Sequence, residues 1–289
     1  MKAMTTNSLT NSQLQQSDPQ GMPIDYHTHN YRCGHAVGEL EEYVLSAIGK
    51  GMVQIGLSDH MPLVNLTQEE HPDIAMPMEE LPRYVEECFR LKEKYKGTID
   101  VRVGLEGDYI EGYEEQIERI ANGFPWDYVI GSVHFLGTWD VTDFRQAGKW
   151  EGRSVVGAYE QYFDAIQKAA ATGLYDFIGH IDAIKRFAPK PPEEDVTPLE
   201  EAALQAVKKH DIAFELNAAG FYAPCKEMYP SERILTRAKE LEIPVTYGSD
   251  AHHPDKVGQK GADARTMLKN VGFTHLATFD GRKRALKPF

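Results

Sequence analysis

Seven short apolar runs recur along the chain, each ending in polar residues, and an amphipathic segment follows most of them. The runs are rich in β-branched and aromatic residues, which indicates strands; they span residues 23–29, 53–60, 100–108, 127–134, 175–182, 212–217 and 243–252. Apolar positions at helical spacing predict helices over residues 38–51, 78–95, 154–173 and 197–210, with two more around residues 231–241 and 262–271.

The alternation of strand and helix predicts a parallel sheet with right-handed crossovers, either an open doubly wound sheet or a closed barrel. No G-x-G-x-x-G motif follows the first run, which disfavours a dinucleotide-binding fold. No linker rich in Pro, Gly or Ser divides the chain, so we expect one α/β domain over residues 23–289 after a mobile polar extension over residues 1–22. Thr197, Pro198 and Glu200 match a capping box, which predicts a helix start at Thr197.

The amino-acid composition narrows the classes of molecule that this chain is expected to bind. The 289 residues carry a formal net charge of −13, which argues against nucleic acid or an anionic membrane as a partner. No apolar run approaches the roughly 18 residues needed to span a bilayer. A small anionic substrate remains possible if metal ions or an arginine meet its charge. Cys33, Cys88 and Cys225 are odd in number and widely spaced, so we expect no disulfide framework and a cytoplasmic location. The oligomeric state stays open.

Six of the seven runs carry His, Asp or Glu at or just beyond their C-terminal ends, and in a parallel barrel all these ends share one face. A single histidine there is usually a packing or surface residue. Many imidazoles packed together without a metal would repel one another when protonated. We therefore predict that this face binds two or three divalent ions, Zn²⁺, Mn²⁺ or Fe²⁺. The predicted ligands are His27, His29, His35, His60, Glu106, His134, His180, Asp250 and His252.

Six ordered motifs resemble the PHP (polymerase and histidinol phosphatase) family: DYHTHNYRCGHA (25–36), GLSDH (56–60), GLE (104–106), GSVH (131–134), GHID (179–182) and GSDAH (248–252). The resemblance covers about residues 23–280. Within the family it is strongest to the histidinol-phosphate phosphatases, and it implies a distorted (β/α)7 barrel with a trinuclear metal site. Carried over to this chain, it implies three groups of ligands: His27, His29, Glu106 and Asp250 for the first ion, Glu106, His134 and His180 for the second, and His35, His60 and His252 for the third.

The same resemblance implies a metal-dependent phosphomonoesterase that hydrolyses L-histidinol phosphate in histidine biosynthesis. We expect attack by a hydroxide that bridges two ions, with Glu106 as the bridging carboxylate and Asp250 as a possible proton relay. The main competing hypothesis is hydrolysis of another small ester, such as a sugar or nucleotide phosphate. A polymerase-linked nuclease module would predict a basic groove. Two further hypotheses are an amidohydrolase-type barrel bridged by a carboxylated Lys185 and a non-catalytic metal-binding protein.

Candidate substrate-binding residues follow the same strand ends. The resemblance favours Arg186, six residues beyond His180, as a catalytic arginine that binds phosphate, and guanidinium geometry suits such a contact; a solvated surface residue is the other interpretation. Ser132 is either a hydroxyl donor to phosphate or a small packing residue. Asp182 either fixes the ring of His180 or binds the substrate amine. Asn217, like Glu215, ends the one run without a ligand, so both could line the substrate pocket; Asp59 could orient His60.

Overall fold

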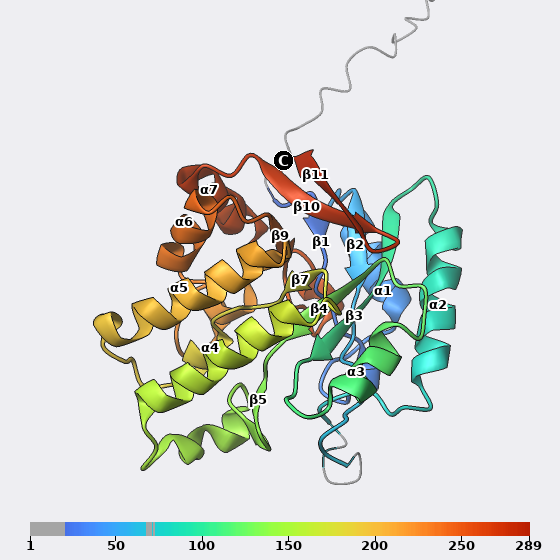
Figure 1. The fold of residues 1–289 in the computed structure, drawn as a ribbon. Coiled ribbons are helices and arrows are strands. Elements are labelled where there is room, and N and C mark those ends of the chain that lie inside the picture. Colours follow the sequence, from blue (N-terminus) through green and yellow to red (C-terminus); the bar gives the residue numbers. More distant parts are fainter. Residues whose placement is uncertain (1–20, 68–70, 72) are drawn as a thin grey trace, which may run out of the picture.

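Seven parallel strands form the centre of the molecule in a computed structural model that describes residues 21–67, 71 and 73–289. Their order in the sheet follows the chain (Figure 1). They are β1 (Ile24–Asp25), β2 (Gln54–Leu57), β3 (Asp100–Asp108), β4 (Tyr128–Ser132), β7 (Phe177–Ile178), β8 (Ala213–Asn217) and β9 (Val245–Gly248). Each of the seven predicted runs therefore contains one strand of this sheet.

The first and last strands meet, which nearly closes the sheet into a barrel. The Tyr26 amide donates to the Tyr247 carbonyl at 3.0 Å, and the His29 amide donates to the Ala251 carbonyl at 2.9 Å. Thr28 and Ala251 add a parallel bridge. These contacts exclude the open doubly wound sheet and confirm the distorted (β/α)7 barrel.

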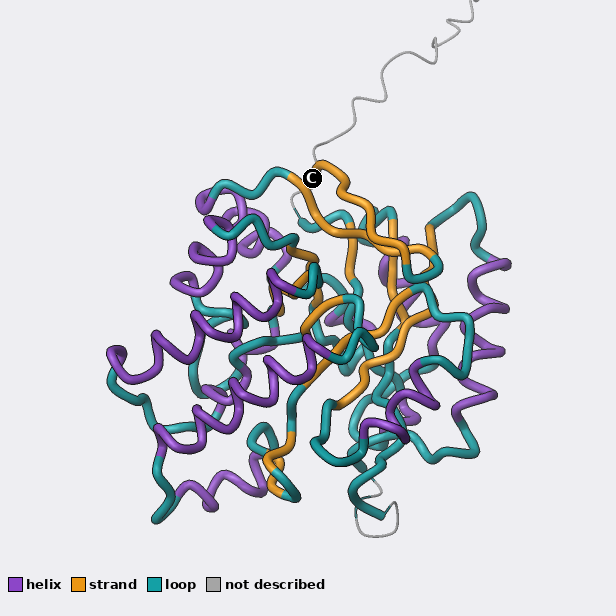
Figure 2. The backbone as a smooth tube through the Cα atoms, viewed as in Figure 1, coloured by secondary structure: helices purple, strands orange, loops and turns teal. Residues whose placement is uncertain are grey.

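Helices cover the outside of the barrel, with α1 to α3 on one side of the view and α4 to α7 on the other (Figures 1 and 2). They are α1 (Leu40–Gly49), α2 (Leu81–Lys94), α3 (Glu114–Ala121), α4 (Val155–Ala171), α5 (Glu193–Lys209), α6 (Glu232–Glu240) and α7 (Gly261–Val271). Five short 3-10 helices lie in the described loops: η1 (Tyr31–Cys33), η2 (Phe144–Trp150), η3 (Ala183–Arg186), η4 (Ala219–Tyr222) and η5 (Pro254–Lys256). Among the described helices, none combines the length and the apolar character that a membrane crossing requires.

Aromatic rings fill the barrel where two strands carry glycine. A Cβ added to Gly104 would lie 2.3 Å from Cζ of Tyr128, and one added to Gly56 would lie 2.0 Å from its hydroxyl. That hydroxyl donates to the Tyr26 carbonyl at 2.7 Å. The glycines therefore admit a fully buried ring that links opposite sides of the barrel.

The sequence pattern does not predict two hairpins that the structure contains. The first consists of β5 (Phe135–Leu136) and β6 (Trp139–Asp140) and follows β4. The second consists of β10 (His275–Asp280) and β11 (Lys283–Pro288). The Phe279 amide of β10 donates to the Tyr26 hydroxyl at 3.2 Å, and the Arg282 amide donates to the carbonyl of Asp127, just before β4. The second hairpin therefore covers the N-terminal end of the barrel, opposite the predicted ligands.

The predicted helix start at Thr197 is wrong. Helix α5 begins at Glu193 and runs through Pro198, and the Thr197 hydroxyl donates to the Glu193 carbonyl at 2.8 Å. Three consecutive acidic residues, at positions 193 to 195, occupy its first turn, where the helix dipole favours negative charge. Residues 1–20 of the predicted extension lie outside the described residues, whereas Met22, at its end, is buried in the core.

Candidate metal centre

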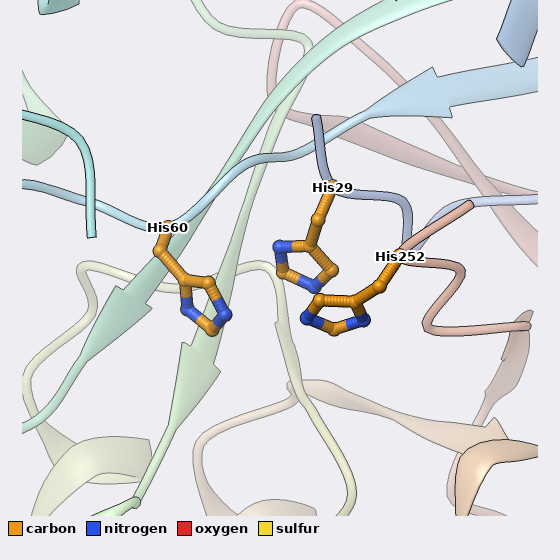
Figure 3. Close-up of side chains that lie close together, drawn as sticks. All are labelled: His29, His60 and His252. Atoms are coloured by element: carbon orange, nitrogen blue, oxygen red, sulfur yellow. The ribbon is translucent and has the colours of Figure 1, made fainter. Parts of the chain in front are cut away.

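All nine predicted ligands gather at the C-terminal end of the barrel. His27 and His29 follow β1, His60 follows β2, and Glu106 lies within β3. The remaining ligands follow β4, β7 and β9, apart from His35, which comes from the loop after η1. Figure 3 shows His29, His60 and His252 with their rings close together. The rings of His60 and His252 each stack on that of His29 with centroids 4.2 Å apart.

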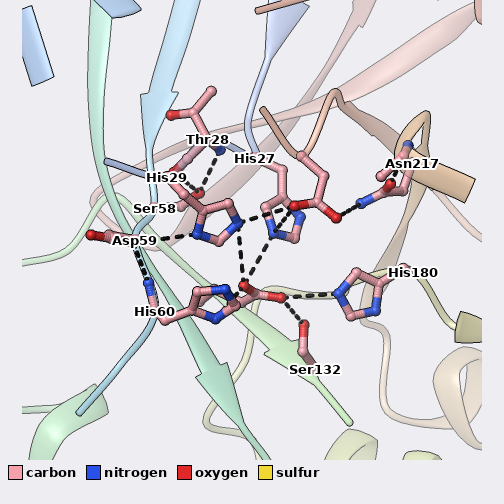
Figure 4. A network of polar contacts seen from close by, with 12 residues as sticks. His27, Thr28, His29, Ser58, Asp59, His60, Ser132, His180 and Asn217 are labelled. Atoms are coloured by element: carbon pink, nitrogen blue, oxygen red, sulfur yellow. Dashed lines mark hydrogen bonds and ion pairs between the residues drawn. The ribbon is translucent and has the colours of Figure 1, made fainter. Parts of the chain in front are cut away.

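The Glu106 carboxylate is at the centre of this cluster. One oxygen, Oε2, lies 2.9 Å from Nδ1 of His60 and 3.2 Å from Nε2 of His27. The other, Oε1, lies 3.0 Å from Nε2 of His180 and 3.6 Å from Nε2 of His134. Figure 4 shows the part of this network that includes His27, His60 and His180. Because the two oxygens face different rings, Glu106 has the position of a bridging ligand.

Several central atoms have no hydrogen-bond partner among the described residues. Nε2 of His27, Nε2 of His29 and Oε2 of Glu106 are buried and make no hydrogen bond within this part of the chain, although the two nitrogens lie only 3.2 and 3.5 Å from that oxygen. Buried polar atoms are normally paired. Lone pairs that converge without hydrogen bonds fit a shared cation, so the donor set suits divalent metal ions.

Potential ligand atoms form overlapping triplets within 4.8 Å of one another. One triplet, His27, His29 and Asp250, contains three of the four ligands implied for the first ion, and Glu106 belongs to two other triplets. None of these triplets of described residues contains the third implied set, of which Nε2 of His35 lies 3.0 Å from Nε2 of His252 and the rings of His35 and His60 have centroids 5.2 Å apart. The triplets are His29–His60–His252, His27–Glu106–His180, His27–His29–Asp250, His29–Cys33–Asp59 and His60–Glu106–His134. The assignment of ligands to individual ions stays a prediction.

Burial and charge oppose each other in the cluster. Burial by itself raises the pKa of Glu106, but His27, His60 and other imidazoles hold that pKa well below its usual range. Burial lowers the pKa of His134, but Asp108 and Glu106 raise it to about 10. For His35, burial together with His60 lowers the pKa to about 4, and the opposing effect of Asp59 is smaller. The centre is therefore a set of strongly coupled charges that favours cations close to Glu106.

Three further carboxylates hold the outer nitrogens of ligand rings. Asp59 lies 3.3 Å from Nδ1 of His29, Asp108 lies 2.8 Å from Nδ1 of His134, and Glu215 lies 2.8 Å from Nδ1 of His27. Such contacts set which ring nitrogen faces the metal. Contrary to expectation, Asp59 contacts the ring of His29 rather than that of His60, and it reaches His60 only through the backbone amide. Strand-end position signalled Asp59 and Glu215 in the sequence but not their partners.

A cavity of about 850 Å³ opens onto the cluster, and Arg186 lines it together with His180, His134 and Glu106. Nε of Arg186 is buried and makes no hydrogen bond to any described residue. Its neighbour Lys185 pairs instead with Asp182 at 2.9 Å and with Glu227 at 3.2 Å. The structure therefore separates the two adjacent cations, with the arginine at the cavity and the lysine held by carboxylates. A carboxylated Lys185 bridge does not fit this arrangement.

The other predicted substrate-binding residues make their hydrogen bonds within the chain. The Ser132 hydroxyl donates to Oε1 of Glu106 at 2.7 Å. Asp182 accepts from the Ser231 amide at 2.9 Å, and the Asn217 side chain donates to Glu215 at 3.0 Å and to Asp250 at 3.3 Å. All three predicted residues are buried. These three residues therefore hydrogen-bond to other residues of the chain and are not among the residues that line the cavity.

Asp250 has an unusual backbone conformation, with φ of 56°. This left-handed region is uncommon for non-glycine residues, although aspartate enters it more readily than most. Its Oδ1 lies 3.2 Å from Nε2 of His29 and 3.8 Å from Nε2 of His27. The turn after β9 therefore directs this carboxylate at both rings of the H-x-H motif.

Comparison with known families gives two matches. The family described as PHP domain matches residues 25–219, and the family described as PHP-associated matches residues 230–262. Together they cover every predicted ligand.

Among individual proteins, the chain is 38% identical to a probable histidinol-phosphatase of Deinococcus radiodurans, over 90% of this chain and 97% of that protein. It is 32% identical to a histidinol-phosphatase of Bacillus subtilis, over 81% of this chain and 95% of that protein. A crystal structure of histidinol phosphate phosphatase from Lactococcus lactis, complexed with zinc, L-histidinol and phosphate, superimposes with a TM-score of 0.76. That similarity has 25% identity and covers 91% of this chain and 98% of the other.

Proposed function

Since the chain belongs to the PHP domain family, we propose that it hydrolyses L-histidinol phosphate to L-histidinol and inorganic phosphate. The observation that carries this proposal is the cavity that Arg186 shares with the His and carboxylate cluster. Metal-dependent hydrolysis of a phosphomonoester needs metal ligands and a cationic donor at one place, and the cavity brings candidates for both together. Relatives called histidinol-phosphatases support the choice of alcohol.

The cluster would hold two or three divalent ions, among which zinc has support from the Lactococcus lactis complex and manganese and iron rest on the donor types. When bound, such ions lower the pKa of a coordinated water and offset the charge of phosphate. Glu106 would bridge two ions through its two oxygens. His27, His29 and Asp250 would form the rest of one ligand set, and His134 with His180 the rest of the next; His35, His60 and His252 would form the third.

Arg186 would bind the phosphate oxygens. Its guanidinium lies at the cavity, and its buried Nε has no hydrogen-bond partner among the described residues. Asp250 remains the proposed proton relay to the leaving alcohol, since it faces the cavity beside the ligand rings. Ser132 and Asn217 would position Glu106 and Asp250, through the hydrogen bonds given above.

The function is tested by phosphate release from a substrate panel with added Zn²⁺ or Mn²⁺. The panel contains L-histidinol phosphate, p-nitrophenyl phosphate, sugar phosphates and nucleotides. We expect a kcat/KM for L-histidinol phosphate about a hundredfold above that for the other esters. Activity on p-nitrophenyl phosphate alone would support phosphomonoesterase activity but would contradict L-histidinol phosphate as the substrate. No release from any ester would overturn the proposal.

The bridging role of Glu106 has its own test. Substitution Glu106→Ala removes both oxygens that face the ligand rings, so we expect at least two ions to be lost together and phosphatase activity to fall to background. Metal content per chain, measured after dialysis at fixed free zinc, reports the loss directly. A variant with wild-type metal content and rate would show that Glu106 is not the bridge.

A further inference from the structure

We propose that Glu215 is a positioning residue that holds ligands of two neighbouring metal sites at a fixed separation. It lies on β8, the one barrel strand that provides no predicted ligand. The inference rests on the metal cluster of the proposed function and is independent of which ester is hydrolysed.

The Glu215 carboxylate contacts ligand residues on two other strands. Its Oε1 lies 2.8 Å from Nδ1 of His27, which follows β1. Its Oε2 accepts from the backbone amide of His180, just after β7, at 3.0 Å, and from the side-chain amide of Asn217 at 3.0 Å. One rigid group thus connects a ligand of the first predicted set with a ligand of the second.

The contact between Glu215 and His27 decides which nitrogen of the His27 ring is free to bind a metal ion. When Nδ1–H donates to Glu215, the lone pair of Nε2 points to the centre, where Nε2 lies 3.2 Å from Glu106 and 3.8 Å from Asp250. A carboxylate at the outer nitrogen also makes the imidazole a stronger ligand. The contact with His180 fixes the backbone from which that ring reaches Glu106.

Neighbouring residues leave the carboxylate little freedom to move. Glu215 has no exposed surface. A Cβ added to Gly248 on β9 would lie 1.8 Å from its Oε1 and 2.5 Å from Cβ of His27. Asn217 also donates to Oδ2 of Asp250 at 3.3 Å, so the arrangement extends to a third strand end. Strand β9 can approach the pair only because it carries glycine at this point.

The chemistry of the position requires a carboxylate. A fully buried charge is costly unless it is paired and hydrogen-bonded, and Glu215 pairs with the His27 ring. All three groups that contact its oxygens can donate a hydrogen bond. A glutamine would place an NH₂ donor against at least one of these donors and would remove the negative charge.

The test compares Glu215→Gln with Glu200→Gln. Glu200 is also a mostly buried glutamate, 8% exposed, but it lies on α5 and pairs with Arg233 on α6. Zinc binding to each metal-free protein is measured by competition with a chromophoric chelator, and folding is checked by circular dichroism. We expect Glu215→Gln to weaken binding of two zinc ions by about 10- to 100-fold each. Glu200→Gln should bind zinc as the wild type does. Excess zinc should restore part of the lost kcat of Glu215→Gln, which a purely structural defect would not allow.

Wild-type affinity for every zinc ion in folded Glu215→Gln would overturn the proposal, and loss of affinity for a single ion would overturn its two-site part. If Glu215→Gln does not fold, Asn217→Ala decides. That variant removes the donor to Glu215 and Asp250, and we expect its zinc affinity to fall severalfold; an unchanged affinity would overturn the proposal. Because zinc titration uses no ester, its result is distinguishable from a failure of the substrate panel.

Discussion

The adjacent residues Lys185 and Arg186 illustrate how surroundings separate two similar cations. Lys185 is held by Asp182, Glu227 and the carbonyl of Met228. Arg186 lines the cavity, and its buried Nε makes no hydrogen bond in the part of the chain that the structure describes. A guanidinium can contact two phosphate oxygens at once. The sequence placed both residues in the same loop, and the structure shows which one is available to an anion.

Arg186→Ala should therefore lower kcat/KM for phosphate esters by about 10²- to 10³-fold, the usual effect of removing one preorganised donor to a developing anion. Zinc content should not change, because Arg186 contacts no ligand in the described network. The matched control is Arg153→Ala, since Arg153 stacks on Trp139 outside this cavity. Unchanged kcat and KM in Arg186→Ala would contradict the assignment.

The reactivity of the three cysteine thiols tests how deeply each side chain is buried. Cys33 and Cys88 are buried, and burial raises the pKa of both thiols, whereas Cys225 is partly exposed. Because the thiolate is the nucleophile, only Cys225 should react with an aromatic disulfide reagent in the folded protein up to about pH 9. All three thiols should react after denaturation. The variant Cys225→Ser should show no fast phase; a remaining fast phase would place the reactive thiol elsewhere.

At the scale of elements, the barrel depends on how closely its strands approach the interior rings. Gly104 on β3 faces Tyr128 on β4, whose hydroxyl is held by the Tyr26 carbonyl. The ring cannot retreat without losing that hydrogen bond. A methyl group added at Gly104 would therefore disturb the packing of β3, of β4 and of the segment that directly follows β1.

Gly104→Ala should lower the free energy of unfolding by about 1–3 kcal/mol, as overpacking of a filled core does. Gly49→Ala in α1 is the matched control: no atom lies within 4 Å of its added Cβ, and alanine favours helix by up to about 1 kcal/mol. Urea denaturation of both variants measures the difference. Equal midpoints would show that the barrel interior can accommodate the methyl group.

At the scale of the whole molecule, the seven barrel strands end on one face and bring carboxylates and imidazoles together there. The opposite end is covered by the hairpin of β10 and β11. The C-terminal end of the barrel therefore carries the candidate metal centre, and the N-terminal end is packed against the hairpin. Metal ions would connect strands that come from the beginning, middle and end of the chain, so their removal should affect the stability of the fold.

We expect chelation to lower the unfolding temperature, and zinc at about a hundredfold above its Kd to add about 2.7 kcal/mol per site to the free energy of unfolding. Scanning calorimetry at fixed pH, with and without zinc, measures the change. Glu106→Gln should show a smaller zinc-dependent increase because it loses the bridging charge. A wild-type unfolding temperature that does not respond to zinc would contradict a structural contribution of the ions.

The local pattern of apolar and polar residues was sufficient to predict the seven barrel strands and most helices. It also predicted that the nine candidate ligands lie on one face of the barrel. Strand alternation and position along the chain carry that information, since the ends of parallel strands must share one edge. His27 and His29 alternate on one extended segment, so their common direction is also a local property. Whether each candidate coordinates a metal stays a prediction.

Contacts between distant residues could not be predicted in this way. His27 meets Glu215 across 188 positions, and nothing near either residue identifies the partner. The same applies to Asp108 beside His134, to closure of β9 on β1 and to the hairpin over the barrel's far end. The start of α5 differs from the local capping pattern because Thr197 bonds back to Glu193 instead of capping a helix. Three-dimensional packing selects these partners, because burial leaves each polar group only the neighbours that the folded barrel provides.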